Sequence, residues 1–476
     1  MIAWQGLAGL AVVALIGCSI AIRGLRPHAL RLDLVDRPGG RKQHARPTPM
    51  HGGLAVLLGV LLALSSGALL NAPVLLSIDI TAVLPFLALA VAVLLLVGVG
   101  LIDDLHGIAG VPKLLAQMLA AVIVMAGGDL VISDLGQWPS GMLIALSWLA
   151  IPVTLLGIVG FVNAVNMMDG VDGLAGGCVA VMLVWLALAA WLANLQGPLV
   201  VAVVTAAAVL AFLLHNLRGP WRAQASVFLG DAGSLSLGLI VIWLAIEISQ
   251  APSRVVSPMG IAWVVALPVL DTFSLLIRRL IHGQNPLKAD RNHLHHLFGR
   301  AGFSPEQTAA VLIALSAVLG GLGVLGSAIG VPDFVLGLGL LVVMAGHYFF
   351  VRYAWRSTRA LKRLRASGEQ LAPAEQLGLV GLYAGMIGVA LGEVVLLALA
   401  AASIAAASVV RFRSLITDLR AISMSWIAAG LLLWLTLAAS RGPDFSGSDW
   451  WPLLWASGVV ALPLGWWFMR LRTHAT

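Results

Sequence analysis

Charged residues are scarce in this sequence. Lys, Arg, Asp and Glu together make up 10% of its 476 residues, whereas a soluble globular domain carries about 25%. Hydrophobic residues make up 60%, and the mean hydropathy is +0.99. Runs of roughly 18 or more apolar residues recur along the whole chain, and each is long enough to span a bilayer. The alternating segments typical of a β-barrel are absent. The sequence therefore predicts an all-α polytopic membrane protein.

Cysteines and nucleic-acid-binding features are also scarce. The two cysteines, Cys18 and Cys178, both lie in predicted spans, which argues against a disulfide framework or a thiolate metal cluster. The net charge is +7, but we find no basic recognition helix and no basic strand interleaved with aromatics, so we expect no nucleic-acid partner. The first apolar run has no basic region before it and no cleavage site after it, which indicates a retained helix.

The apolar runs predict ten to eleven spans in a core at residues 1–351. They lie near 3–22, 52–70, 82–101, 113–127, 142–161, 175–194, 198–215, 232–249, 259–280, 308–328 and 331–351. The stretch "GDLVISDLGQWPSG" after the fourth span predicts a small hairpin at the far surface.

Beyond the core we expect a basic cytoplasmic linker at 352–375 and an additional bundle at 376–476. The bundle holds three to four segments, because its first run, 376–410, has room for two short ones. The linker reads as a surface helix resting on anionic lipid. We favour a scaffold or an oligomer interface, with a homodimer as one form, for the bundle.

The distribution of Lys and Arg predicts the orientation. Of the 28 such residues, we assign only Arg254 and Arg441 to the outer side. The others gather in alternate loops, which are therefore cytoplasmic by the positive-inside rule. The acids at span ends fall on that same side.

Adjacent acids end one apolar run in "LIDDLHG". Asp103 and Asp104 at a helix C-terminus would oppose the macrodipole, so a plain helix end in water is the weaker reading. Carboxylates there suit metal binding or proton abstraction. In "FLGDAGSLSLG", Asp231 precedes a helix, where it is either a plain N-cap or a carboxylate that holds a metal.

A third stretch, "NAVNMMDGVDGLAGG", places Asn163, Asn166, Asp169 and Asp172 three residues apart. They would share one face of a helix, although the glycines suggest a turn before the next span. Turn and N-cap chemistry explains one of them, not four. Their oxygen donors suit a hard cation such as Mg²⁺.

Two basic loops complete the polar set. The first, "DRPGGRKQHARPTPMHGG" at 36–53, is an ordered loop that by itself reads most simply as a positive-inside anchor. The second, "NPLKADRNHLHHLFGRAG" at 285–302, fits no standard zinc motif. A cationic loop that grips a phosphate is the better interpretation, with a plain solvated loop as the alternative.

Taken in order, "DRPGGRKQH…HGG", "LIDDLHG", "NAVNMMDGVDGLAGG", "FLGDAGS" and "DRNHLHHLF" resemble the signature loops of the polyprenyl-phosphate N-acetylhexosamine-1-phosphate transferases, of the glycosyltransferase family 4 type. The match covers about residues 1–350. The "HLHH" run is similar to the bacterial undecaprenyl-phosphate N-acetylglucosamine-1-phosphate branch, and differs from the three consecutive histidines of the muramoyl-pentapeptide branch.

The resemblance implies a reaction in the bacterial inner membrane, with the active site facing the cytoplasm. A UDP-N-acetylhexosamine and undecaprenyl phosphate would give the lipid diphosphate sugar and UMP. The product would start lipid-linked cell-envelope glycan synthesis. The implied cofactor is Mg²⁺, with Mn²⁺ as a second candidate.

The resemblance also implies roles for individual residues. Asp231 would be the principal metal ligand and Asn166 a second one. Catalytic roles would fall to Asp103, Asp104 and Asp231. Substrate-binding roles would fall to Lys113, Asn163, Asp169, Asp172, Arg291, His293, His295, His296, Arg41 and His44. The proposed base role of the Asp pair is debatable, because a lipid phosphate with a second pKa of about 6 is already largely ionised at pH 7.

Two other classes of function compete with this one. An ion-coupled transporter would place acids and broken helices near the midplane, often in two related halves. Here the acids lie at span ends, and we see no internal repeat. A catalytically silent scaffold is the other alternative, which the intact Asp231 and Asn166 oppose.

Overall fold

The computed structural model describes residues 4–37, 47–69, 83–137, 140–218, 222–284 and 292–368, with side chains as far as Arg363. Arg41, His44, Arg291 and the bundle predicted at 376–476 lie outside these residues. The fold is an all-α polytopic membrane protein, as predicted. The division of the chain into core, linker and bundle stays a prediction.

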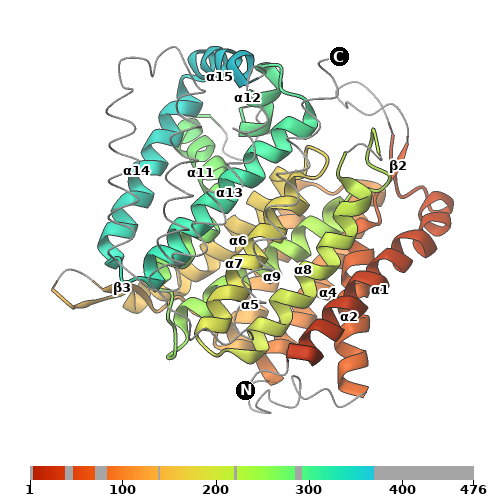
Figure 1. Ribbon diagram of the computed structural model, residues 1–476, viewed down its shortest axis with the longest axis horizontal. Helices are drawn as coiled ribbons and strands as arrows, with labels where there is room; N and C mark the ends of the chain where they lie inside the picture. Colours follow the sequence, from red (N-terminus) through yellow and green to blue (C-terminus); the bar gives the residue numbers. More distant parts are fainter. Residues whose placement is uncertain are drawn as a thin grey trace, which may run out of the picture.

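Within the described residues, ten helices are long and apolar enough to cross a membrane. They are α1 (Trp4–Arg31), α2 (Gly52–Leu69), α4 (Val83–His106), α5 (Gly110–Gly128), α6 (Ala150–Met168), α7 (Leu174–Leu192), α8 (Gln196–Asn216), α9 (Gly230–Gln250), α13 (Pro305–Ala328) and α14 (Asp333–Arg352). Two short helices, α12 (Leu294–Arg300) and α15 (Ala354–Gly368), lie together at one end of the bundle, which we call the α12 end (Figure 1).

The span expected at 259–280 is not one straight helix. It forms α10 (Pro258–Val264) and α11 (Ala266–Ile281), which meet at a bend of 80°. Pro268 explains the break, because it has no N–H for the Val264 carbonyl and its ring crowds that position. The run at 142–161 also starts differently: its first residues form a strand and a 3₁₀ turn (Ser147–Leu149), and α6 begins only at Ala150.

The hairpin predicted between the fourth and fifth spans is confirmed. Strands β3 (Asp134–Gln137) and β4 (Leu143–Ala145) pair antiparallel. Figure 1 shows them at the opposite end of the bundle from α12 and α15, and α14 runs from one end to the other. We call this the hairpin end.

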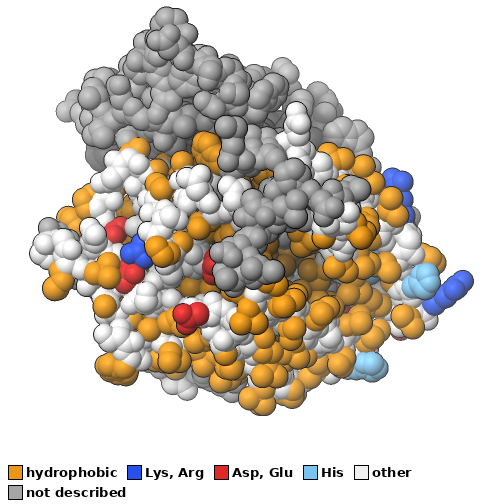
Figure 2. Space-filling view, turned by 90° about the horizontal axis from the view of Figure 1, so that it is seen from below, with side chains coloured by type: hydrophobic (Ala, Val, Ile, Leu, Met, Phe, Trp, Pro, Cys, Tyr) orange, Lys and Arg blue, Asp and Glu red, His pale blue; other side chains and the backbone are white. Residues whose placement is uncertain are grey.

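Helices α7, α8 and α9 form the centre of the bundle. About nine tenths of the apolar window of each is buried, against 11% for α14. Helices α1 and α2 pack on α8, α4 and α6 pack on α9, and α13 packs on α7. The face in Figure 2 is mostly hydrophobic, with few charged side chains, as expected for helices that meet lipid.

Two glycines allow α2 and α4 to approach the start of α9. A Cβ on Gly53 would lie 2.1 Å from Cα of Gly233, and one on Gly100 would lie 2.4 Å from the backbone nitrogen of Ala232. No side chain fits at either contact. The chain before α2 also pairs with the chain before α9, since the Gly53 N–H donates to the Leu229 carbonyl at 2.9 Å. This packing brings the end of α4 to the beginning of α9.

The basic loop at 36–53 is described only at its two ends. Strand β1 (Val35–Asp36) pairs antiparallel with β2 (Thr48–Pro49). His51 follows β2 and is 2% exposed. Its Nε2 lies 2.9 Å from the Ile22 carbonyl of α1, which ties the start of α2 to α1.

Candidate active site

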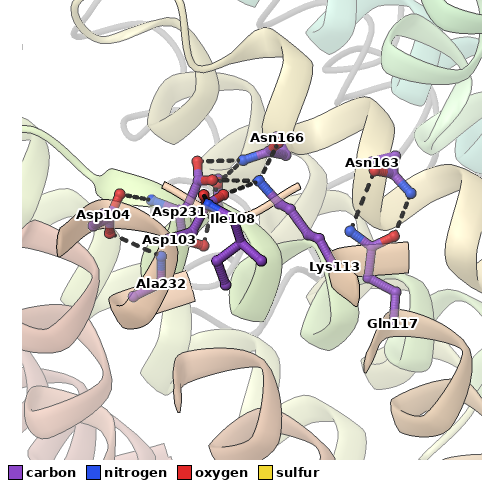
Figure 3. Close-up of polar contacts among 10 residues, drawn as sticks. Asp103, Asp104, Ile108, Lys113, Gln117, Asn163, Asn166, Asp231 and Ala232 are labelled. Carbon is purple, nitrogen blue, oxygen red and sulfur yellow. Dashed lines mark hydrogen bonds and ion pairs between the residues drawn. The ribbon is translucent and has the colours of Figure 1, made fainter. Parts of the chain in front are cut away.

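Four helix ends converge on one ammonium group at the α12 end. Lys113, in the first turn of α5, donates to Asp103 Oδ2 at 2.9 Å, to Asn166 Oδ1 at 3.2 Å and to Asp231 Oδ2 (Figure 3). Asp103 lies in the last turn of α4, Asn166 in the last turn of α6 and Asp231 in the first turn of α9. We call these four residues the Lys113 centre. Its oxygen donors come from three helices that are far apart in sequence.

Asn166 also fixes the position of the Asp231 carboxylate. Its Nδ2 donates to Asp231 Oδ1 at 2.7 Å and to Ser234 Oγ at 2.8 Å. The amide oxygen of Asn166 is therefore turned toward Lys113. Ser234, one turn along α9 and fully buried, was not among the predicted site residues.

The adjacent acids at the end of α4 face different partners. Asp104 accepts hydrogen bonds from the backbone N–H groups of Asp231 at 2.9 Å and Ala232 at 3.3 Å, so it caps α9 from another helix. Asp103 instead accepts from the Ile108 N–H at 2.6 Å and from Lys113. The plain N-cap reading of Asp231 does not hold, because Asp231 is the second residue of α9 and the cap comes from Asp104.

Asp169 adds a further carboxyl group at the end of α6. No hydrogen bond reaches its side chain from the described residues. Burial, and then the negative charges of Asp231 and Asp104, raise its pKa to about 8. Several carboxyl groups thus surround one lysine, and with this pKa Asp169 carries a proton at neutral pH. A cation bound nearby would favour its ionised form.

Asn163 lies one helical turn away from the Lys113 centre. It exchanges two hydrogen bonds with Gln117 of α5, one of them at 3.2 Å, and donates to the Val159 carbonyl at 2.9 Å. Its amide is therefore used to join α5 to α6. Gln117 is 1% exposed and was not among the predicted site residues. It could have been found in the sequence as the single amide side chain of an apolar span, one turn after Lys113.

Asp172 is held on the far side of the same turn. Its Oδ2 accepts from Arg218 Nε at 2.6 Å and from the Ala225 N–H at 3.3 Å. Nearby, Asn216 accepts from the Gly173 N–H at 2.7 Å and fixes the start of α7. The four polar residues of this stretch thus share no single face, since α6 ends at Met168.

The histidine loop is anchored by an acid that the sequence analysis did not single out. Asp271, in α11 just after the bend, is 5% exposed. Its Oδ2 lies 2.9 Å from His293 Nδ1, and its Oδ1 accepts from the Leu294 N–H at 3.0 Å. His347 of α14 approaches Asp271 Oδ1 at 3.7 Å. The signal for Asp271 was an acid inside the apolar run "ALPVLDTFSLL".

His295 connects this loop to the turn that carries Asp169. Its Nε2 would lie 3.0 Å from a Cβ placed on Gly170, so the ring packs directly on that glycine. Burial, and then the neighbouring His296, lower the pKa of His295 to about 3, so the ring is neutral at neutral pH. His293 stacks on His295 with ring centroids 5.9 Å apart, whereas His296 is exposed.

The donor set around Lys113 fits a hard cation in part. Among the described residues, no group of three His, Cys, Asp or Glu side chains is arranged as a complete metal site. The Lys113 centre offers two carboxylates and one amide oxygen, already gathered around a positive charge. Mg²⁺ typically takes one or two carboxylates and completes its shell with water and substrate phosphates. The residues therefore fit Mg²⁺ as a partial site, provided that the Lys113 ammonium moves aside.

The family is identified by comparison with known proteins. The sequence model of glycosyl transferase family 4 matches residues 86–249, which include Asp103, Lys113, Asn166 and Asp231. Three curated relatives share the name undecaprenyl-phosphate alpha-N-acetylglucosaminyl 1-phosphate transferase.

Each of these relatives matches between 71% and 76% of this chain. The one from Haemophilus influenzae is 29% identical over 369 residues, which are 76% of this chain and 99% of the relative. The one from Salmonella typhi is 30% identical over 344 residues, and that from Escherichia coli strain K12 is 30% identical over 342 residues; each match covers 71% of this chain and 89% of the relative. The chain therefore belongs to glycosyl transferase family 4 and is a membrane sugar-phosphate transferase.

Proposed function

We propose that the protein transfers an N-acetylhexosamine 1-phosphate, with N-acetylglucosamine 1-phosphate as the first candidate, from a UDP-sugar to undecaprenyl phosphate. The products are the lipid diphosphate sugar and UMP. The names of the relatives suggest the lipid and the sugar. The observation that carries the proposal is the gathering of Asp103, Asn166 and Asp231 around the Lys113 ammonium, where phosphates and a divalent cation would meet.

Asp231 and Asn166 would hold Mg²⁺, and Asp103 lies close enough to share it. The bound metal would neutralise charge on the phosphate oxygens that react. Lys113, released from the carboxylates, would bind a phosphate oxygen in turn. This division suits phosphoryl transfer, in which positioning and charge neutralisation supply most of the catalysis.

The two acids of α4 receive different roles. Asp104 is bonded to two backbone N–H groups of α9, so it would keep Asp231 in place. Asp103 faces Lys113 and would orient the acceptor phosphate. A general base is not required, because the acceptor phosphate has a second pKa of about 6 and is already largely ionised at neutral pH.

The nucleotide and the sugar would bind beside the contact between the α6–α7 turn and α12. Asp169 and Asp172 border this region on one side, and His295 packs on Gly170 between them. His293, oriented by Asp271, would present its Nε2 to the diphosphate or the sugar. Exposed His296 would act at the rim.

We assign the α12 end to the cytoplasmic face of the inner membrane. Arg218, Arg352 and Lys113 lie at this end, and Arg254 lies at the hairpin end beside Asp134. By the positive-inside rule, the Lys113 centre would then face the cytoplasm, the side from which we expect the UDP-sugar to bind. A transporter would need its acids near the midplane, whereas Asp103 and Asp231 lie in terminal turns of their helices.

The test is UMP release by the purified full chain. It would be supplied with Mg²⁺ and undecaprenyl phosphate, and with one UDP-N-acetylhexosamine at a time. We expect release that requires the lipid, is lost with EDTA, returns with Mg²⁺ or Mn²⁺, and is fastest with one sugar. Folded protein that releases no UMP with any donor would contradict the proposal, and ion flux in proteoliposomes would then be measured.

A further inference from the structure

Helix α15 begins where the last described span ends. α14 finishes at Arg352, and α15 runs from Ala354 to Gly368. Among the side chains of α15 that the structure describes, those up to Arg363, Ser357 and Leu361 face the protein and are each 7% exposed. Ser357 Oγ donates to the Phe350 carbonyl at 2.6 Å, and α15 contacts both α12 and α14. One side of the helix is therefore fixed to the bundle at the point where α14 leaves the membrane.

The opposite side of α15 is basic. Arg356 and Arg359 are exposed and lie three residues apart, so they share a face, and the exposed Lys362 follows three residues later. Arg352 extends the same row at the end of α14. The sequence of α15, "AWRSTRALKRLRASG", has no acid. We call these four residues the basic face.

Aromatic side chains accompany the basic face. Trp355 is 55% exposed and Tyr353 is 41% exposed. The Arg359 guanidinium lies 4.2 Å from the centre of the Trp355 ring, and Arg356 lies 5.4 Å from that of Tyr353. Trp and Tyr prefer the depth of lipid head groups. Large exposed aromatics next to arginines at the end of a span are costly in water and favourable at a membrane surface.

We propose that the basic face of α15 binds the anionic head groups of the phospholipids that surround the protein. Clusters of four or more Lys and Arg next to a membrane span attract negatively charged lipid, and the attraction acts within a Debye length of the surface. The basic face meets this condition because α14 holds it at the membrane boundary. The occupant is bilayer phospholipid, separate from the polyprenyl phosphate that reacts at the Lys113 centre.

The two native cysteines make a direct test possible. Cys18 and Cys178 are both 0% exposed, so a new cysteine on the surface can be labelled selectively. We would place a nitroxide label on Ala360→Cys, which is exposed beside the basic face, and on Ser140→Cys at the hairpin end as a control. The full chain would be studied in nanodiscs of phosphatidylcholine alone or mixed with phosphatidylglycerol.

The expected result is specific to α15. With phosphatidylglycerol, the accessibility of the Ala360→Cys label to an aqueous relaxation agent should fall severalfold, and high salt should restore it. The Ser140→Cys label should respond to neither change. A label that behaves identically in both lipids would overturn the proposal. If it is accessible in both, the face binds no lipid. If it is shielded in both, protein covers the face.

Charge-removing variants test which residues are responsible. Arg356→Gln, Arg359→Gln and Lys362→Gln combined should abolish the lipid effect. Arg23→Gln, Arg26→Gln and Arg31→Gln on α1 remove the same charge from exposed positions and should leave the effect intact. If both triple variants lose the lipid effect equally, the label responds to net charge alone, and the assignment of lipid binding to α15 is wrong. The label assay needs no turnover, so its outcome is independent of the proposed reaction.

Discussion

The two ends of the bundle each carry a cluster of charged groups, and the clusters differ in balance. At the hairpin end, Arg254 donates to both carboxylate oxygens of Asp134 at 2.9 Å, so this acid has a base of its own, and Asp333 accepts from the Gln137 N–H. At the α12 end, a single Lys113 contacts both Asp103 and Asp231. Asp104 and Asp169 add further acids close by.

The difference separates a structural cluster from a functional one. This balanced pair holds the hairpin close to the end of α9, where Gln250 Oε1 also accepts from the backbone N–H groups of Ser133 and Asp134. An excess of carboxyl groups beside one lysine makes it costly to ionise all of them together, because like charges repel in a poorly hydrated setting. Such an arrangement is favourable only when a cation or a substrate completes it.

The largest effect is expected from Asp231→Asn, which removes charge but keeps shape. Loss of a metal-binding carboxylate should lower the rate of UMP release by at least about a hundredfold. The apparent melting temperature in detergent should stay near that of the wild type, because the asparagine oxygen can still accept the hydrogen bond from Lys113. A variant that keeps wild-type turnover would remove Asp231 from the metal site.

Lys113→Met tests whether the ammonium and the metal use the same oxygens. Activity should fall by about a hundredfold, since a phosphate-binding charge is lost. Without metal the variant should melt below the wild type, but Mg²⁺ should raise its melting temperature more than it raises that of the wild type. The matched change at the other end, Arg254→Met, should give no such gain with Mg²⁺.

Asp271→Asn should lower kcat/KM by about tenfold to a hundredfold, which is the usual cost of losing a carboxylate that orients a functional histidine. The loss should appear mainly in KM, because His293 would be misoriented for binding. Ser274→Ala is the control. Ser274 lies on α11, like Asp271, and its loss removes a hydrogen bond to His347 of α14 while Asp271 and His293 stay paired. A similar loss in both variants would point to packing instead.

Arg254→Met should affect stability and spare chemistry. Leaving Asp134 buried without its partner should cost about 1–3 kcal/mol, seen as a lower melting temperature, with unchanged turnover per folded molecule. The double change with Asp134→Leu should recover part of this loss, because no unpaired charge remains. Loss of turnover in protein that melts normally would show that the two ends are coupled.

The last prediction concerns His295 and how stability depends on pH. Its pKa is about 3 in the folded protein and 6.5 without the fold, so below pH 6.5 the unfolded chain binds the extra proton. Stability should therefore fall as the pH drops through this window, by up to about 1.4 kcal/mol per pH unit. Asp169, with a raised pKa, contributes the opposite slope, so melting curves of the wild type and His295→Gln should be compared. Parallel curves would contradict the assignment.

Apolar run lengths were sufficient to place the spans and the hairpin. Ten spans and the hairpin agree with these expectations, and the acids lie at helix ends as expected. The hydropathy of a run of residues is a local property, so it can be read from a single sequence. The motif order likewise led to the family that the comparisons confirm.

The contacts between side chains of different helices could not be predicted from the sequence, because they depend on how the helices pack. That Asp104 caps α9, that Asn163 pairs with Gln117 and that Asp271 holds His293 depends on how each helix is rotated about its axis. A shift of one residue turns a side chain by about 100°, and the rotation is set by contacts such as those of Gly53 and Gly100. Residue composition decides that polar groups lie at the membrane boundary, but only the tight approach of distant helices decides which of them meet.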